Sequence, residues 1–279
     1  MKKGISQWAF AGKKLEECFK MAKAAGYDGV GAAIDNDGEI NLKSKQADID
    51  KVLASAEKAG VEVSSLATGL FWGTSLTSDD KGEREKAKDI VRKMLEVAAW
   101  LKVDTILVVP GAVDVIFDPS FPKVSYDLVW ERSLEAMKEL APEAEEKQVA
   151  IGVENVWNKF LLTPLEMKNF VDEVGSDYVG TYFDVGNVIP YGYPEQWIRI
   201  LGKRIKKVHF KDYKQSVGTL DGFVNLLYGS VNWPEVMAAF KDVGYDDWVT
   251  AELFPANHYP ESIINETSLS MDKILGRQG

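Results

Sequence analysis

The chain has 279 residues, of which 46% are hydrophobic and 27% are charged, a composition typical of a globular protein with a large buried core. Its 33 Lys and Arg residues against 43 Asp and Glu residues give a net charge of −10, which opposes binding to nucleic acids and anionic membrane surfaces. Cys18 is the only cysteine, which excludes an internal disulfide, and no apolar run approaches the roughly 20 residues that cross a bilayer. We therefore expect a cytoplasmic protein that binds neither nucleic acid nor membrane.

Short apolar runs with strand-like composition alternate with longer amphipathic segments along the whole chain. In chain order, the predicted strands are residues 3–10, 29–34, 61–67, 103–109, 149–154, 178–184, 205–210 and 248–252. The predicted helices are residues 15–25, 47–59, 83–101, 126–147, 163–173, 194–201, 233–243 and 261–275. Gly26 and Gly60 stop the first two helices, and Thr163 with Glu166 forms a capping-box signature.

The chain contains eight strand–helix units, and its length is close to the roughly 250 residues typical of a (β/α)8 barrel. The pattern therefore predicts this α/β fold, with residues 1–279 as a single barrel domain. A doubly wound open sheet would give the same alternation of elements. Such a sheet usually carries a glycine-rich phosphate-binding turn after its first strand. The first strand here runs into Ser6-Gln7-Trp8-Ala9-Phe10 instead, so the barrel is favoured.

Polar side chains end four consecutive predicted strands. Glu154 ends AIGVE, Asp184 ends VGTYFD, His209 lies near the end of the next strand, and Glu252 ends WVTAE. The active site of a (β/α)8 barrel lies at the carboxyl ends of its strands, so these side chains converge on one rim. Three carboxylates would repel one another there unless a divalent cation neutralised them, and a mixed oxygen and nitrogen donor set suits Mn, Mg, Co or Zn.

Each of these residues also has an ordinary structural explanation. A carboxylate at a strand end is more often a salt-bridge partner or a helix cap, and a single histidine is usually a hydrogen-bonded core residue. Four such residues on consecutive strands are hard to obtain by chance, and His209 is one of only two histidines in the chain. The combination therefore favours a metal site.

Four segments also resemble a known family. They are VENVWNKF (153–160), YFDVGN (182–187), VHFKD (208–212) and AEL (251–253). They look like those of the xylose-isomerase-like sugar phosphate isomerase/epimerase superfamily, which includes D-tagatose, D-psicose and L-xylulose 5-phosphate 3-epimerases. The resemblance implies that Glu154, Asp184, His209 and Glu252 bind one divalent metal ion, with Mn favoured. It also implies that Glu154 and Glu252 are the catalytic acid and base.

That arrangement has a chemical reason. A proton on the carbon beside a ketone is too weakly acidic to leave at neutral pH unless a metal bound to the ketone and hydroxyl oxygens stabilises the cis-enediolate. Epimerisation then needs one base on each face of the planar intermediate. The leading prediction is a ketose or ketose phosphate 3-epimerase, or an aldose–ketose isomerase, acting on a small-molecule sugar.

The predicted substrate contacts follow strand ends. Aromatic rings could stack on a sugar, and amide or ammonium groups could bind its hydroxyls. The residues chosen are Trp8, Trp72, Trp157, Asn187, Lys211 and Gln215. Phe71, Asn155 and Asn158 are further candidates. The alternative explanation for Lys211 is an ion pair with Asp212, and His258 is expected at the surface rather than on a substrate phosphate.

The chain departs from its relatives where those relatives contact substrate. Free-ketose epimerases carry a histidine where Asn187 stands, and phosphopentulose epimerases commonly have an arginine at the position of Gln215. The acidic residue that many relatives have near Gly31 is missing, and Ser230 replaces part of a GEG-like turn. The identity of the sugar therefore stays open.

Three alternatives remain. The same site could serve a keto-sugar or keto-inositol dehydratase or a 3-keto-glycoside lyase, because the enediolate can expel a β leaving group. A sugar-binding relative that has lost activity is the second. A repair endonuclease of the same fold is disfavoured, because two histidines cannot build a trinuclear zinc site and the net charge repels DNA. By analogy with similar barrels, a homodimer or homotetramer is expected.

Overall fold

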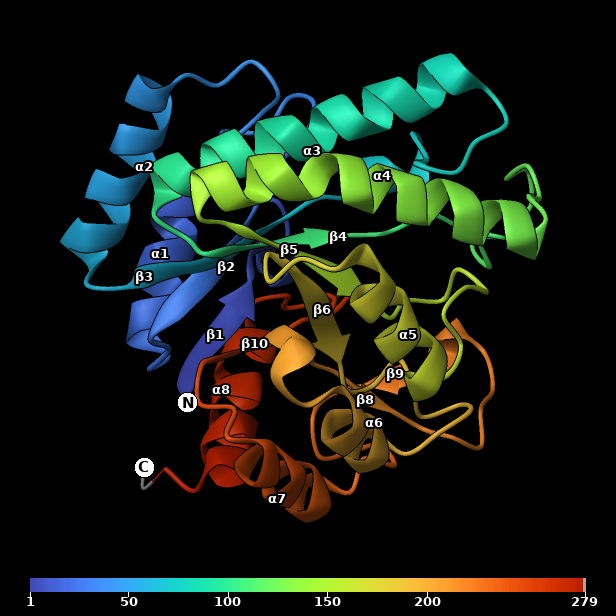
Figure 1. Ribbon diagram of the computed structural model, residues 1–279. Coiled ribbons are helices and arrows are strands. Elements are labelled where there is room, and N and C mark those ends of the chain that lie inside the picture. The colour runs from blue at the N-terminus through green and yellow to red at the C-terminus, as the bar shows by residue number, and fades with distance from the viewer. Residues whose placement is uncertain (278–279) are drawn as a thin grey trace.

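The computed structural model describes residues 1–277 and contains a closed barrel of eight parallel strands (Figure 1). The strands are β1 (Lys2–Ser6), β2 (Gly29–Ala33), β3 (Glu62–Ala67), β4 (Thr105–Val108), β5 (Ala150–Glu154), β6 (Val179–Asp184), β7 (Ile205–Phe210) and β10 (Trp248–Ala251). They follow one another around the ring in chain order, and β1 closes it by pairing with both β2 and β10. The predicted (β/α)8 barrel is confirmed.

Helices surround the barrel, and α3 and α4 lie side by side along one flank (Figure 1). Their bounds are α1 (Leu15–Ala24), α2 (Gln46–Ala59), α3 (Lys81–Leu101), α4 (Tyr126–Lys147), α5 (Pro164–Val174), α6 (Pro194–Leu201), α7 (Trp233–Val243) and α8 (Ser262–Leu275). The predicted helices agree with these bounds to within two residues. Within residues 1–277, no helix combines the length and the apolar character needed to cross a membrane.

The first predicted strand, residues 3–10, is too long. β1 ends at Ser6, whose hydroxyl accepts a hydrogen bond from the Trp8 backbone N–H at 3.3 Å. Residues Gln7–Phe10 then form a short 3-10 helix, η1. The apolar composition of this segment is typical of a strand, but the serine turns the chain as it leaves the barrel, which places Trp8 over the strand ends.

The sequence pattern also missed a two-stranded hairpin after β7, formed by β8 (Asp212–Tyr213) and β9 (Phe223–Val224). The buried Asp212 carboxylate holds the segments that follow it. It accepts hydrogen bonds from the backbone N–H groups of Tyr213, Leu227 and Val231 and from the indole N–H of Trp233. The predicted alternative of an ion pair between Lys211 and Asp212 is therefore wrong, because Asp212 is fully engaged by these donors.

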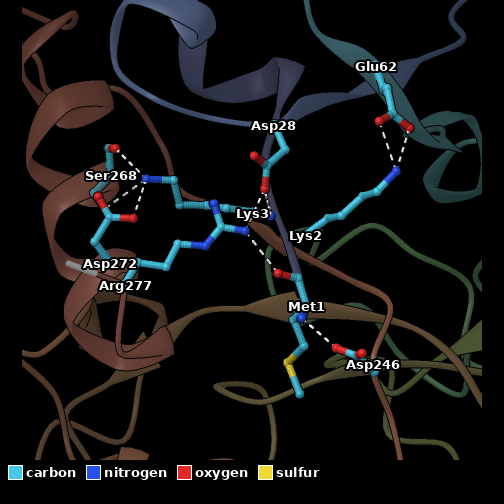
Figure 2. A network of polar contacts seen from close by, with 9 residues as sticks. All are labelled: Met1, Lys2, Lys3, Asp28, Glu62, Asp246, Ser268, Asp272 and Arg277. Atoms are coloured by element: carbon cyan, nitrogen blue, oxygen red, sulfur yellow. Dashed lines mark hydrogen bonds and ion pairs between the residues drawn. The ribbon is translucent and has the colours of Figure 1, made fainter. Parts of the chain in front are cut away.

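A polar network ties the amino-terminal end of the barrel to α8 (Figure 2). The Lys3 side chain is 1% exposed, and its ammonium lies 2.6 Å from Asp272 Oδ1 and 2.9 Å from Ser268 Oγ. Arg277 reaches from the end of α8 to Asp28 at 2.6 Å. These contacts join the first strand to the last helix at the end of the barrel opposite the carboxyl ends of the strands.

Replacing Asp272 with Asn is expected to lower the free energy of unfolding by about 2 kcal/mol, because it leaves the buried Lys3 ammonium without its counterion. Lys3→Met should cost less than about 1 kcal/mol, since a hydrophobic side chain of similar size removes the buried charge. Urea unfolding at pH 7 measures both. Lys2→Met is the matched control, because the Lys2–Glu62 pair is exposed and should contribute less than about 1 kcal/mol. Equal losses for Asp272→Asn and Lys3→Met would contradict the interpretation.

Candidate metal centre and substrate cavity

Four side chains that could hold a metal ion converge at the carboxyl ends of four neighbouring strands. Glu154 and Asp184 are the last residues of β5 and β6, His209 is the last but one of β7, and Glu252 follows β10 directly. One atom from each lies within 4.8 Å of the others. The barrel register explains the convergence, because Asp184 and His209 are paired partners on β6 and β7.

The facing atoms lack hydrogen-bond partners in the protein. Glu154 Oε1, Asp184 Oδ2, His209 Nδ1 and Glu252 Oε2 are buried, and none forms a hydrogen bond of acceptable geometry. His209 Nδ1 lies 3.0 Å from Glu252 Oε2 and 3.5 Å from Glu154 Oε1. A single unsatisfied buried polar atom costs about 1 to 3 kcal/mol, so four facing one point require an explanation. One divalent cation bound by three oxygens and a nitrogen would satisfy all four.

The electrostatics of the cluster reflect burial together with the opposing influence of its carboxylates and its cations. Burial raises the pKa of Glu154 and Asp184. Burial opposes protonation of His209, but the neighbouring carboxylates Glu252 and Glu154 outweigh it and raise the pKa of the imidazole to about 9. Burial also opposes ionisation of Glu252, yet Lys211 and His209 hold the pKa of that carboxyl well below its usual range. The carboxylates of the cluster thus stabilise the positively charged forms of His209 and Lys211.

Lys211 supplies part of that positive charge. Its ammonium lies 2.6 Å from Glu252 Oε2 and 3.3 Å from Asp184 Oδ2, and its side chain is 11% exposed. Burial opposes the charged form, but the carboxylates of Asp184, Glu252 and Glu154 hold the pKa of Lys211 above its usual range. Gly186 makes room for it, because a Cβ there would lie 2.6 Å from the Lys211 Cβ. Lys211 is therefore a cation directed at the cluster rather than at Asp212.

Two asparagines fix the position of Asp184. The Asn155 amide spans from β5 to β6, where its Oδ1 accepts from the Asp184 backbone N–H and its Nδ2 donates to the Asp184 carbonyl, both at 2.8 Å. The Asn187 backbone N–H donates to Asp184 Oδ1 at 2.8 Å, and the Asn187 side chain donates to the Asn155 carbonyl. One oxygen of Asp184 is thereby held by the backbone, which leaves Oδ2 facing the cluster.

Asn155→Ala is expected to weaken Mn²⁺ binding by about 10- to 100-fold, because residues that orient metal ligands typically contribute that much to affinity. Calorimetric titration with MnCl2 measures the change. Asn158→Ala is the matched control: Asn158 lies in the same loop and is equally buried, but its side chain bonds the Gly111 carbonyl and the Phe160 N–H. Unchanged affinity in Asn155→Ala, or an equal loss in both variants, would contradict an orienting role.

A cavity of about 510 Å³ opens above the cluster, and it contains most of the predicted substrate contacts. Its buried end, which we call the floor, is formed by Glu154, Asn187, Lys211 and Glu252. Trp8, Trp72 and Trp157 line its walls. The Trp157 indole donates to the Asn187 carbonyl at 3.0 Å, which fixes that wall to the β6 end of the barrel.

Other predicted residues lie elsewhere. Gln215 is exposed after the β8 strand, where its backbone N–H donates to Ser230 Oγ, and it does not line this cavity. Phe71 belongs to the hydrophobic core. Asn158 has the structural role described above, and His258 is exposed as expected.

The sequence pattern missed several apolar residues of the cavity because they lie in loops or in the hairpin. Phe117, Leu220, Phe223 and Phe254 are the main ones. Phe117 lies in the long connection between β4 and α4, and its ring packs at 82° to the ring of Trp72 with centroids 4.9 Å apart. Phe254 follows the predicted ligand Glu252 by two residues. This spacing from a predicted ligand is the only feature of the sequence that could have indicated Phe254. No hydrophobic periodicity marks Phe117, Leu220 or Phe223.

Known proteins share this architecture. A curated relative from Actinoplanes sp., a 2-epi-5-epi-valiolone 7-phosphate 2-epimerase, is 25% identical over 77% of this chain and 74% of its own. The uncharacterized protein MJ1311 from Methanocaldococcus jannaschii is 24% identical over 68% of this chain, which spans 64% of that protein's length. A solved structure of D-psicose 3-epimerase with D-tagatose from Clostridium cellulolyticum H10 superposes with a TM-score of 0.82 at 20% identity over 99% of both chains. The IOLI protein, solved with a bound zinc atom, gives 0.78 at 20% identity over 99% of both chains.

The family model for the xylose isomerase-like TIM barrel matches residues 19–273, which includes all four candidate metal ligands. The closed parallel barrel and its full-length structural neighbours agree with that match. This chain belongs to the xylose isomerase-like TIM barrel family.

Proposed function

We propose that the protein is a metal-dependent sugar isomerase or epimerase that moves a proton on the carbon beside a ketone, acting as a ketose or ketose phosphate 3-epimerase. The observation that carries the proposal is a set of four buried atoms from three carboxylates and an imidazole, none with a hydrogen bond of acceptable geometry, that lie together beneath a sugar-sized cavity. Family membership and the epimerase relative support the reaction class.

Glu154, Asp184, His209 and Glu252 would hold one divalent ion, with Mn favoured over Mg, Co or Zn for this mixed donor set. Such an ion, when bound, supplies Lewis-acid stabilisation of the negative charge that develops on the ketose oxygens. The unpartnered carboxylate and imidazole atoms fit this assignment, and Asn155 and Asn187 hold the Asp184 ligand in place.

Proton transfer would fall to Glu154 and Glu252. Around the ring β5 and β10 are separated by β6 and β7, so the two carboxylates approach the floor of the cavity from opposite sides of the cluster. One would remove the proton from C3, and the other, in its protonated form, would donate a proton to the opposite face, which inverts the carbon. Which of them removes the proton depends on the configuration of the substrate.

The remaining floor and wall residues would orient the sugar. Asn187 and Lys211 offer donors at the floor, and the rings of Trp8, Trp72 and Trp157 offer apolar faces on which a sugar ring can stack.

Deuterium uptake tests the proposal. The protein loaded with Mn²⁺ is incubated with ketoses and ketose phosphates in heavy water, and the carbon beside the ketone is followed by NMR. Deuterium at C3 with formation of the epimer is the expected result. Loss of water or of an aglycone would assign the site to a dehydratase or lyase, and sugar binding without any exchange would identify a binding protein.

Three further expectations belong with this proposal. Residues 1–279 would form one domain, the protein would act in the cytoplasm, and it would assemble as a homodimer or homotetramer. Light scattering coupled to gel filtration measures the assembly directly.

A further inference from the structure

The charge distribution in the cavity is unfavourable for a phosphate group. Among the residues of the described range 1–277 that line it, the charged ones are Glu154, Glu252 and Lys211. The Lys211 ammonium is already paired with Glu252 and Asp184, at 2.6 and 3.3 Å. Phosphate groups in proteins are generally bound by arginine, lysine or helix N-termini. A substrate phosphate in this cavity would meet two carboxylates and a lysine whose charge is shared with the cluster.

The mouth of the cavity is apolar and open to solvent. Phe254 is 74% exposed, Phe117 is 50% exposed and Leu220 is 38% exposed, although all three line the cavity. We call these residues the apolar rim. At the floor, in contrast, Glu154 and Asn187 are 5% and 2% exposed. Exposed apolar side chains gathered around one opening generally mark a binding surface, because water contact with them is unfavourable.

The rim continues into the aromatic walls. The rim residue Phe117 packs against the wall residue Trp72, and the wall residue Trp157 packs against Phe223 with ring centroids 5.2 Å apart. The cavity volume of about 510 Å³ falls within the roughly 300 to 1,000 Å³ typical of sites for drug-sized ligands. A bare monosaccharide at the floor would leave the apolar rim in contact with water.

We propose that the substrate is an uncharged keto sugar that carries an aromatic substituent. The sugar ring would lie at the floor beside Glu154 and Glu252, and the aromatic group would pack against Phe117, Leu220 and Phe254. This inference rests on the proposed function, because both concern the same cavity. Of the two substrate classes in the proposed function, ketoses and ketose phosphates, the inference selects the unphosphorylated ketoses.

Dissociation constants, measured without following turnover, test the inference. The Mn²⁺-loaded protein is titrated with 6-O-benzyl-D-fructose and 6-O-methyl-D-fructose, and in parallel with D-fructose and D-fructose 6-phosphate. Burial of the phenyl ring should make the benzyl ether bind about 10- to 100-fold more tightly than the methyl ether. The phosphate of fructose 6-phosphate should give no gain over fructose.

Variants locate the effect. Phe254→Ala should lower the affinity for the benzyl ether more than that for the methyl ether. Leu269→Ala is the matched control, because Leu269 is 70% exposed on α8 and does not line the cavity, so the phenyl preference should be unchanged. Equal binding of the two ethers, tighter binding of the phosphorylated ketose, or no binding of any of the four sugars would overturn the inference.

The two proposals fail in different ways. Preferential binding of the benzyl ether with no deuterium exchange at C3 of any ketose would leave the substrate inference standing and remove the proposed function. Rapid exchange on fructose 6-phosphate with no preference for the phenyl group would do the reverse.

Discussion

Asp184→Asn is expected to weaken Mn²⁺ binding by more than about 100-fold and to abolish proton exchange with it. The residue is fully buried, and its Oδ2 has no hydrogen-bond partner in the protein and lies 3.3 Å from the Lys211 ammonium. Residues that only orient ligands contribute about 10- to 100-fold to metal affinity, so loss of a charged ligand should exceed that range. Asparagine keeps an oxygen that can accept from the Asn187 backbone N–H, so the fold should survive. Titration calorimetry with MnCl2 gives the affinity.

Asp246→Asn makes the same chemical change at the amino-terminal end of the barrel, where the carboxylate is 83% exposed and pairs with the amino group of Met1 (Figure 2). It should bind Mn²⁺ as the parent protein does. If Asp184→Asn retained one tightly bound equivalent of metal, the four-residue centre would be wrong.

Glu154→Gln and Glu252→Gln should each slow epimerisation by about 100- to 10,000-fold at saturating metal, the range typical of a positioned acid or base. The two variants should also differ from each other. Each carboxylate faces one side of the substrate, so each variant should lose exchange mainly from one of the two C3 epimers. Starting from each purified epimer in heavy water and following deuterium at C3 by NMR separates these effects.

The comparison must be made at metal saturation, because both residues are also proposed ligands. Equal loss of exchange from both epimers in one variant, with no loss in the other, would indicate a single base and argue against the two-base mechanism.

Much of the centre could be predicted from sequence because its residues end buried strands. Parallel strands in a barrel read as apolar runs, so Glu154 and Asp184 interrupt the pattern where each strand leaves the core. The carboxyl ends of the strands share one rim, which makes convergence of the side chains a consequence of the fold. The structure places four facing atoms within 4.8 Å of one another at that rim.

The mouth of the cavity could not be predicted in the same way. Phe117 and Phe254 lie in loops whose paths depend on tertiary contacts, such as the edge-on packing of Phe117 on Trp72. The hairpin that carries Phe223 is held by hydrogen bonds that Asp212 accepts from residues up to 21 positions away, a separation that no local pattern reveals. The Lys211 side chain likewise points to the cluster because the Asp212 carboxylate already accepts hydrogen bonds from other residues, whereas Glu252 and Asp184 can pair with the ammonium.

The most direct test of the central claim is an anomalous difference map from a crystal soaked in MnCl2. One strong peak within coordination distance of Glu154, Asp184, His209 and Glu252 is the predicted result. Absence of a peak in the soaked crystal, or a peak that contacts fewer than three of these residues, would contradict the proposed metal centre.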